Sequence, residues 1–542
     1  MDSSTKSFAD FESSSGGTPA FDFIVCGSGS SGSVVAGRLA EHPEVRVLLL
    51  EAGGDDEIPQ VRTAGQWPLN LGTERDWNFH AAPDNAVNGR SVPMSMGKVL
   101  GGGSSINTMI WAWGHRSDWD HFAAESGDPA WGYDSILDVY RRIEDWHGTP
   151  DPRYRGTGGP VFVQTAPDPH PIAHAVVDGA KSLGIPTFDS HNGEMMEGPG
   201  GAAIIDLRIR DGFRQSAYRS YVHPHRTQPN LTVFPNALVI RLVMNDLTVT
   251  GVEFIHGGKV YRAEAANEVV LSLGAFNTPK LLMQSGIGDN AHLQRHGIPV
   301  VQHLPGVGQN FQDHVGFDCL WECKELITPR NNGVEATYFW RSDPGLDSPD
   351  LQTCQAQFPK SSSAENTKRF DPPEASWNLF PGLVQAKSRG EILLTGPSPH
   401  DALDIRARFL SHPDDLKAAI AAVELAREVG NSAELSPFTK REVMPGPLKG
   451  AELERFIRDA ASTYWHQSGT AKMGNDAMAV VDGNLKVHGV DRLRVTDASI
   501  MPRITTGNTQ APCVVIGERA ADILCAAHNL PVAPSLAGGE RA

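Results

Sequence analysis

The sequence predicts an α/β protein with more than one domain, and three observations carry this prediction. The chain has 542 residues, whereas one hydrophobic core serves roughly 100–200 residues. Near its start, an apolar run, a glycine-rich turn, a helical stretch and a second apolar run follow each other within residues 21–51. An apolar run leading into a helical stretch recurs at residues 268–286, as expected of a late strand and helix of the same parallel sheet.

Composition and charge exclude several classes of function. Hydrophobic residues make up 40% of the chain and charged residues 20%, which is typical of a globular protein and not of a disordered one. The formal net charge of −17 disfavours general binding to nucleic acid or to an anionic membrane surface. No apolar run approaches the roughly 18 residues that a membrane span needs.

The cysteines and the chain ends bear on the cellular compartment. The six cysteines contain no Cys-x-x-Cys pair and no zinc spacing, so we expect a reducing compartment and no metal site. Residues 1–19 are polar and serine-rich and lack the apolar centre of a secretory signal. We therefore interpret residues 1–19 and 536–542 as flexible tails and expect a cytoplasmic protein.

Residues 21–51 have the pattern of a dinucleotide-binding unit. Residues 21–26 predict a first strand and residues 45–50 a second, with a helical stretch between them. Glu51 ends the second strand, about 20 residues past the glycines, where a carboxylate accepts hydrogen bonds from ribose hydroxyls. An acid at this place, instead of an arginine, argues against NADP and leaves NAD and FAD open.

The three glycines of the turn have separate tasks in such a unit. Gly27 permits the tight turn, Gly29 lets the backbone approach a pyrophosphate, and Gly32 lets the helix pack closely on the strand. The helix N-terminus supplies free N–H groups and positive potential for the phosphates. The glycines alone could form an ordinary surface turn, but the flanking strands, the helix and the acid favour a nucleotide site.

Two further glycine-rich stretches follow. Residues 97–107 contain three consecutive glycines and two serines, which suits a backbone passing a flat ring or a diphosphate, or else a flexible loop. Residues 274–288 follow the apolar run 268–273, which predicts a buried parallel strand. Thr278 and Pro279 predict the start of a helix, and a Ser-Gly-Ile-Gly sequence predicts its end.

Together, the first glycine turn and the stretches at 97–107 and 274–288 resemble the glucose–methanol–choline (GMC) oxidoreductase family, which binds FAD. The resemblance extends from Phe21 to Leu524 and is weakest at residues 319–389, where we find no motif. It implies a Rossmann-like FAD-binding domain and a substrate-binding domain made of an antiparallel sheet with helices. The implied division assigns residues 20–160, 203–314 and 460–535 to the first domain, and residues 161–202 and 315–459 to the second.

The resemblance also implies which residues contact FAD. The loop after Gly103 is expected to meet the flavin ring, and the backbone at Val239 is expected to bind the adenine. Some family members attach FAD through a histidine directly before the Asn of the second stretch, but here Ile106 precedes Asn107 and offers no nucleophile. We therefore expect non-covalent FAD. The expected cofactor-binding residues are Gly27, Gly29, Ser31, Gly32, Glu51, Ala52, Gly97, Val99, Gly102, Gly103, Ser104, Asn107, Val239, Gly274, Asp497, Ala498, Asn508, Thr509 and Gln510.

The C-terminal quarter contains the expected catalytic residues. Oxidising a primary alcohol to an aldehyde removes a proton from oxygen and a hydride from carbon, and flavin N5 takes the hydride. The proton needs a base, for which histidine is the best match near neutral pH, and a second group should hold the substrate oxygen. By the resemblance, His466 and Asn508 occupy these paired positions. Asn508 also suits a turn or a helix cap, and Trp465 suits either the core or a wall of the substrate pocket.

The last helix is expected to assist. Apolar residues at helical spacing follow Pro512, which marks the first turn. If the N-terminus of this helix points at the flavin, the helix dipole stabilises negative charge on the ring. The resemblance then implies that backbone N–H groups of Thr509 and Gln510 serve a ring carbonyl, and that Asp497 and Ala498 bind the ribityl and diphosphate region.

The substrate is the part that the sequence determines least. Family members that oxidise choline carry an acidic residue a few positions after a Gln-Asp-His triplet. Here the triplet at 312–314 is followed by Val315 and Gly316, and Asp318 would need a shifted loop. We expect a neutral primary alcohol of aryl, furfuryl or sugar type, with oxygen or another acceptor reoxidising the flavin. The alternatives are a choline-type dehydrogenase or oxidase and a redox-silent flavoprotein like the hydroxynitrile lyases. Oligomeric state stays open.

Overall fold

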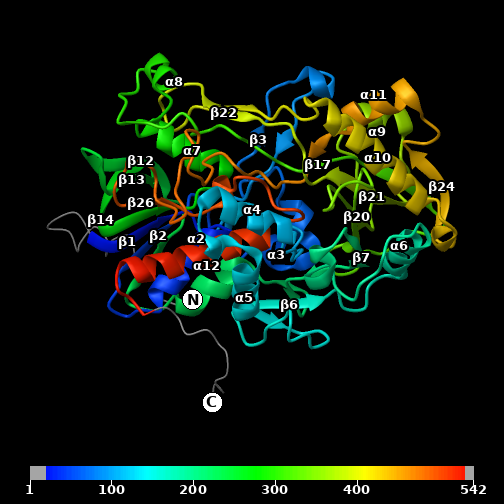
Figure 1. The fold of residues 1–542 in the computed structure, drawn as a ribbon, viewed down its shortest axis with the longest axis horizontal. Helices are drawn as coiled ribbons and strands as arrows, with labels where there is room; N and C mark the ends of the chain where they lie inside the picture. Colours follow the sequence, from blue (N-terminus) through cyan, green and yellow to red (C-terminus); the bar gives the residue numbers. More distant parts are fainter. Residues whose placement is uncertain (1–19, 532–542) are drawn as a thin grey trace.

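The computed structural model describes residues 20–531 and shows two sheet-centred halves side by side (Figure 1). Strands β1 (Ala20–Cys26) and β14 (Lys259–Leu271) lie in one half, and strands β20 (Leu351–Ala356) and β21 (Ser376–Leu383) lie in the other. This arrangement confirms the predicted α/β class with one largely parallel and one antiparallel sheet.

The first sheet has seven strands in the order β11-β2-β1-β14-β13-β12, with β26 paired to β14. Strands β11, β2, β1, β14 and β26 are parallel to their neighbours, so their carboxyl ends share one edge. Gly27 and Glu51 directly follow two of these ends, which places the predicted nucleotide residues along that edge. The remaining strands are β2 (Val47–Leu50), β11 (Leu231–Phe234), β12 (Leu238–Asn245), β13 (Thr248–His256) and β26 (Leu493–Val495).

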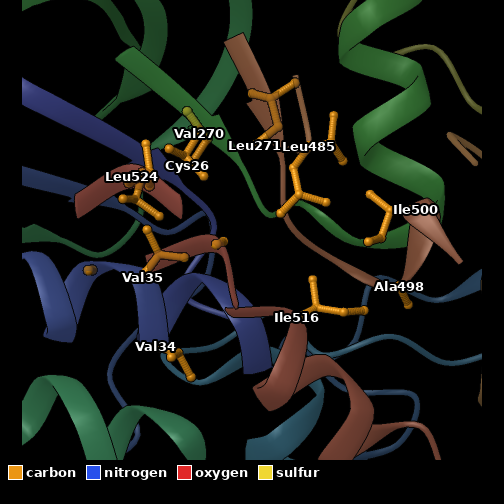
Figure 2. Close-up of a cluster of buried hydrophobic side chains, with 14 of the residues drawn as sticks. Cys26, Val34, Val35, Val270, Leu271, Leu485, Ala498, Ile500, Ile516 and Leu524 are labelled. Carbon is orange, nitrogen blue, oxygen red and sulfur yellow. The ribbon is translucent and has the colours of Figure 1, made fainter. Parts of the chain in front are cut away.

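Helices α2 (Ser30–Ala40) and α12 (Gln510–Ala527) pack against each other beside this sheet. Figure 2 shows Val35 of α2 and Ile516 of α12 in one buried cluster with residues of the strands. A Cβ atom at Gly517 of α12 would come within 2.7 Å of Cβ of Val34, so a glycine is needed for the two helices to approach this closely. The predicted first and last helices are therefore confirmed, and their packing fixes both N-termini relative to the sheet edge.

The second sheet is antiparallel and has eight strands, with a main order β24-β18-β21-β20-β19-β7. Strands β20 and β21 are buried along their whole length, and helix α10 (Pro413–Gly430) packs against both. Because side chains alternate along a strand, the side chains on the face of this sheet opposite α10 are free to line a cavity. The other strands are β7 (Gly201–Ile204), β17 (Val315–Gly316), β18 (Cys319–Cys323), β19 (Val334–Trp340), β24 (Thr439–Met444) and β25 (Ser462–Thr463).

One predicted helix start is wrong. Helix α7 (Gly274–Gln284) begins four residues before Thr278, and Pro279 lies inside it. Proline has no N–H, so it cannot donate to the carbonyl of Ala275 one turn earlier. The Thr470 hydroxyl donates to that carbonyl instead, at 2.6 Å. A residue almost 200 positions away thus supplies the missing hydrogen bond, which allows the helix to continue through the proline.

The remaining elements surround the two sheets. The other α-helices are α3 (Pro59–Arg62), α4 (Arg116–Ser126), α5 (Tyr133–Ile143), α6 (Pro171–Ser182), α8 (Asn290–Arg295), α9 (Ala364–Phe370) and α11 (Gly450–Ala460). The short helical turns are η1 (Ala64–Asn70), η2 (Asn85–Val87), η3 (Gly102–Ser105), η4 (Pro129–Trp131), η5 (Gly193–Glu197), η6 (Tyr218–Val222), η7 (His223–His225), η8 (Ala433–Leu435) and η9 (Ala498–Ile500). The remaining strands are β3 (Phe79–His80), β4 (Pro93–Met94), β5 (Glu144–Trp146), β6 (Val161–Thr165), β8 (Asp206–Leu207), β9 (Ile209–Arg210), β10 (Phe213–Arg214), β15 (Ile287–Gly288), β16 (Gln302–His303), β22 (Glu391–Leu394) and β23 (Leu403–Arg406).

The two sheets support a division of the chain that we propose. It comprises a nucleotide-binding domain of residues 20–160, 203–314 and 460–535 and a substrate-binding domain of residues 161–202 and 315–459. The short strands β7 and β25 of the second sheet lie close to the junctions between these segments. The expected tails at 1–19 and 536–542 lie outside the described residues. Between residues 20 and 531, no helix is both long enough and apolar enough to cross a bilayer.

Candidate active site

A cavity of about 840 Å³ is lined by residues of both halves. It lies toward the upper end of the roughly 300–1,000 Å³ typical of ligand pockets. Most residues expected to bind cofactor or substrate meet there, although they come from segments far apart in the sequence. They are Gly27, Gly29, Ser31, Glu51, Ala52, Gly97, Gly102, Gly103, Asn107, Val239, Gly274, Trp465, His466, Asp497, Ala498, Asn508, Thr509 and Gln510.

Three expected cofactor residues do not line the cavity and instead support its walls. A Cβ atom at Gly32 would collide with the carbonyl oxygen of Gly27, so this glycine permits the close packing of helix on turn. Val99 is buried in a small apolar cluster. The Ser104 hydroxyl donates to the carbonyl of Gly101 at 2.6 Å and accepts the N–H of Ala217 at 3.0 Å, which braces the glycine-rich loop.

Glu51 is held at the carboxyl edge of the first sheet. One of its carboxylate oxygens accepts the N–H and the hydroxyl of Ser28 at 3.0 and 2.8 Å, and the other accepts the N–H of Gly53 at 2.8 Å. Burial raises the pKa of Glu51, and these donors act against that shift. The carboxylate retains unused lone pairs on the cavity side, so it can accept hydrogen bonds from a ribose.

The cavity walls fit a bound dinucleotide. A Cβ atom at Gly27 would collide with the carbonyl of Ser272, so only glycine allows this turn. The N-termini of α2 and α12 have neither a side-chain cap nor an acidic residue in the first turn, and both contribute residues to the cavity. Their free N–H groups suit the negatively charged parts of such a ligand. The side-chain Nε2 of Gln510 is buried without a hydrogen-bond partner and lines the same cavity, as expected of a group that serves a ligand.

A hydrogen-bonded chain of side chains crosses the floor of the cavity at His466. Gln352 Nε2 donates to Oδ1 of Asn508 at 3.1 Å, which directs the Asn508 amide nitrogen toward His466. Asn508 Nδ2 lies 3.2 Å from Nε2 of His466, and His466 Nδ1 lies 2.9 Å from Nδ1 of His314. Because the amide nitrogen can only donate, His466 Nε2 is the acceptor, and the ring proton lies on Nδ1. The lone pair of Nε2 therefore points at the Asn508 amide nitrogen, and both residues line the cavity.

A second buried acid, Asp313, fixes the backbone at His466. Asp313 Oδ1 accepts the N–H of His466 at 3.0 Å, and its Oδ2 accepts the Thr463 hydroxyl at 2.5 Å. Burial raises the pKa of Asp313 to about 7, and it lowers the pKa of His466 to about 3. Burial also places the pKa of His314 well below its usual range. Both histidines are therefore neutral at physiological pH, so the His466 ring keeps a lone pair on Nε2.

Aromatic rings form the wall next to His466. Trp465 lines the cavity and has a positive backbone φ of 62°, a conformation that few non-glycine residues adopt and that often occurs at functional sites. Phe380 and Tyr464 also line it, with ring centroids 4.4 Å apart. Lys360 lines this part of the cavity too, and it forms an ion pair of 2.9 Å with Asp318.

Sequence reasoning missed the walls contributed by the second sheet. Lys360, Cys354 and Phe380 lie in the motif-poor region 319–389. Cys354 and Phe380 belong to strands β20 and β21 and Lys360 to the loop after β20, and neither a plain strand nor this loop leaves a motif. It also missed that the Asp and His of the triplet at 312–314 hold His466. They lie 152 or 153 residues before His466, which gives no spacing signal, so only the fold reveals these contacts.

A parallel sheet with a glycine turn at its carboxyl edge, opening into a cavity with a buried His–Asn pair, defines a dinucleotide-binding enzyme. Residues 21–316 and 386–517 match the family models of the GMC oxidoreductases. Oxygen-dependent choline dehydrogenases are similar over most of the chain. That of Brucella suis is 35% identical over 535 residues, covering 92% of this chain and 95% of that protein. That of Sinorhizobium fredii is 36% identical over 534 residues, with the same shares of 92% and 95%.

Solved structures agree. Pyridoxine 4-oxidase from Mesorbium loti superposes with a TM-score of 0.87 at 32% identity, covering 92% of this chain and 98% of that one. A variant of formate oxidase from Aspergillus oryzae has a TM-score of 0.87 at 27% identity, covering 94% and 99%. The chain belongs to the GMC oxidoreductase family. It is an FAD-dependent oxidoreductase that acts on CH–OH groups, as the resemblance implied.

Proposed function

We propose that this protein oxidises a primary alcohol to an aldehyde, with His466 as the base and Asn508 as the group that positions the substrate oxygen. The observation that carries the proposal is the contact of 3.2 Å between Asn508 Nδ2 and His466 Nε2 inside the cavity. An alcohol oxygen that lies in the cavity within hydrogen-bond reach of both atoms can accept from the amide while its own proton points at the imidazole lone pair, in place of the direct contact between the two side chains.

The proposed roles of the chain's own groups follow from the hydrogen bonds. His466 Nε2 takes the hydroxyl proton, and the resulting imidazolium shares its Nδ1 proton with His314 Nδ1. Asn508 Nδ2 holds the oxygen as negative charge develops there, and Gln352 keeps the amide in this orientation. Asp313 fixes the backbone of His466, so that the ring keeps its place while the proton moves. When bound, FAD supplies the acceptor, flavin N5, for the hydride that leaves the carbon.

We propose that the cavity residues named above hold FAD without a covalent bond, because Ile106 stands on the wall of the cavity directly before Asn107 and has no nucleophile. The glycines at 27, 29, 97, 102, 103 and 274 allow close backbone approach. Glu51 serves the ribose, and the N-terminus of α12 serves the ring. Asp497 has both oxygens engaged by Ser499, Gly274 and Thr278, so we propose that its contribution is to shape this loop beside FAD.

For the substrate, we propose a neutral alcohol of aryl, furfuryl or sugar type. The wall of Trp465, Tyr464 and Phe380 suits a flat ring. Asp318 is buried and paired with Lys360, so it offers no free carboxylate to a cationic substrate. Either oxygen or another acceptor reoxidises the flavin, and the ratio of peroxide formed to dye reduced distinguishes the two.

The test is anaerobic bleaching of the flavin absorbance by an alcohol. We expect benzyl alcohol or hydroxymethylfurfural to bleach the wild type. His466→Ala should keep its flavin and lose the rate of bleaching by about 100- to 10,000-fold, the contribution of a positioned general base. His121→Ala is the matched control, since His121 does not line the cavity. Bleaching of His466→Ala at the wild-type rate would overturn the proposal.

Choline is the second candidate, because the relatives reported above are named choline dehydrogenases. It is distinguished by comparing kcat/KM for choline, benzyl alcohol, hydroxymethylfurfural and sorbose. We expect choline to be the poorest of the four. A tenfold advantage for choline would assign the choline activity to this chain and reject the neutral substrate class.

A further inference from the structure

The aromatic wall of the cavity already contains a cation that belongs to the protein. Nζ of Lys360 lies 3.4 Å from the centroid of the Phe380 ring and 5.6 Å from that of Trp465. Such faces are what aromatic cages use to bind quaternary ammonium groups. Here the ammonium group of Lys360 takes that position, so a substrate cation would have to compete with it.

Asp318, the ion-pair partner of Lys360, is more deeply buried than the lysine. Asp318 is 1% exposed, whereas the Lys360 side chain is 19% exposed and is part of the cavity lining. Asp318 Oδ2 also accepts the N–H of Ser362 at 2.5 Å, and its Oδ1 accepts from Lys360 at 2.9 Å. The carboxylate is therefore turned into the protein and the ammonium group toward the cavity. Burial lowers the pKa of Lys360, and the nearby carboxylate opposes that shift.

The acidic residues of the cavity lining do not compensate this charge at the aromatic wall. They are Glu51, Asp401 and Asp497. Ser28 and Gly53 hold Glu51, the N–H of Ser398 holds Asp401, and Gly274, Thr278 and Ser499 hold Asp497. Each of them lies in a segment other than the strands and loops that carry Phe380, Trp465 and Lys360. The wall next to His466 thus presents the ammonium end of the Lys360–Asp318 ion pair to an incoming substrate.

We propose that Lys360 sets the charge preference of the substrate pocket. The pocket binds aryl alcohols that carry a carboxylate remote from the hydroxyl more tightly than uncharged ones, and it rejects quaternary ammonium alcohols. This inference rests on the proposed function and revises its neutral substrate class, because it names anionic aryl alcohols as the preferred substrates of the same site. A carboxylate near Lys360 gains a charge-assisted hydrogen bond, while a trimethylammonium group meets a like charge on an occupied aromatic face.

The test measures binding separately from turnover. Calorimetry on the FAD-loaded enzyme uses three probes that cannot be oxidised as alcohols: 4-methylbenzoate, 4-methylbenzamide and benzyltrimethylammonium. We expect 4-methylbenzoate to bind at least tenfold more tightly than the amide, and benzyltrimethylammonium to bind at least tenfold more weakly. Equal affinity for the three probes, or a preference for the cation, would overturn the proposal.

Variants assign the preference to the lysine. Lys360→Met keeps the aliphatic stem and should lose the preference for 4-methylbenzoate by at least tenfold. It should also gain affinity for benzyltrimethylammonium, because the competing ammonium group is removed from the aromatic face and Asp318 loses its partner. Lys360→Arg keeps the charge and should keep the order of the probes. Lys368→Met, at an exposed lysine of the adjacent α9, is the matched control and should leave all three affinities unchanged.

A folding defect and a wrong substrate class are both recognisable. The double variant Asp318→Asn/Lys360→Met removes both charges together. A buried unpaired carboxylate therefore cannot explain a change in the affinities of this variant for the probes. The amount of bound FAD, measured by the flavin absorbance, reports whether the variant is folded. The double variant should bind the three probes with similar affinity, and retention of the wild-type order would overturn the proposal. If the charge order holds but neither 4-(hydroxymethyl)benzoate nor benzyl alcohol bleaches the flavin, the proposed function fails and the charge preference stands.

Discussion

At the scale of single residues, the neutral state of His466 depends on where its neighbours hold their protons. Asn508 donates to one ring nitrogen and His314 shares a proton with the other, so these two neighbours set the tautomer of the His466 ring. Asp313 contributes through the backbone N–H of His466. Asp313 is thus a positioning residue. Because it is buried, its charged form is disfavoured, which costs folding free energy.

Asp313→Asn should change how stability depends on pH. Since the pKa of Asp313 rises from its ordinary value of 3.8 to about 7 on folding, the folded protein keeps a proton that the unfolded chain has lost between about pH 4 and 7. Its contribution to stability is therefore largest in acid and falls as pH rises through that window, by at most about 4 kcal/mol. Asparagine does not titrate, so the melting temperature of Asp313→Asn relative to wild type should be higher at pH 8 than at pH 5.

The control for this prediction is Asp138→Asn, because the Asp138 side chain is 77% exposed. Its difference from wild type should be the same at both pH values. If Asp313→Asn also gave equal differences at pH 5 and pH 8, the carboxyl group would titrate normally in the folded protein, which would contradict the raised pKa of Asp313.

At the scale of elements, helix α7 depends on a side chain from another segment. Thr470 is fully buried, and its hydroxyl replaces the N–H that Pro279 lacks. Thr470→Val keeps the shape and removes the donor, which should leave the Ala275 carbonyl unpaired and cost about 1–3 kcal/mol of stability. In a Pro279→Ala background the alanine N–H can take over, so the same substitution should cost less there. Thermal or urea unfolding of the wild type, the two single variants and the double variant measures the difference.

Two results bear on this prediction. Thr470→Ser retains the hydroxyl and should be less destabilising than Thr470→Val in the Pro279 background. An equal cost of Thr470→Val in both backgrounds would show that the hydroxyl does not compensate for the proline.

The same helix shows what sequence can and cannot predict. The strand–turn–helix unit at residues 21–51 was predictable because its glycines are required by local backbone geometry, and the sheet confirms it. The start of α7 was not predictable, because the hydrogen bond that allows the helix to include Pro279 comes from Thr470 in a distant segment. The residues of the cavity wall in β20 and β21 were not predictable, because such positions require only a side chain of suitable size and polarity and leave no motif. The family resemblance predicts His466 and Asn508 as a pair, and the structure places their side chains 3.2 Å apart, whereas the contact with His314 requires the fold.

At the scale of the whole molecule, the cofactor cavity joins segments from all parts of the chain. The N-terminal turn, the loop around Gly102, helix α7 and the start of α12 all line it. A ligand that binds only the assembled cavity stabilises the folded state in proportion to its affinity. Removing FAD should therefore lower the melting temperature, and adding free FAD back should restore it.

Acid precipitation provides the complementary measurement. Since Ile106 offers no nucleophile, all of the yellow colour should appear in the supernatant. Flavin that stays with the precipitated protein would show a covalent bond and would contradict the proposed mode of FAD binding. Equal melting temperatures with and without FAD would contradict the view that FAD ties these segments together.

Strand β20 has a consequence for how this enzyme can acquire new substrates. Its alternate residues Gln352, Cys354 and Ala356 have different partners: the first orients Asn508, and the next two line the cavity with small side chains. Cys354 Sγ accepts from the same Gln352 amide nitrogen at 3.5 Å, so a change at Cys354 also alters the support of Asn508. Exchanging Ala356 for a larger side chain would remould the cavity and leave that amide in place, so directed evolution toward foreign alcohols should begin at Ala356, with Gln352 and Cys354 left as they are.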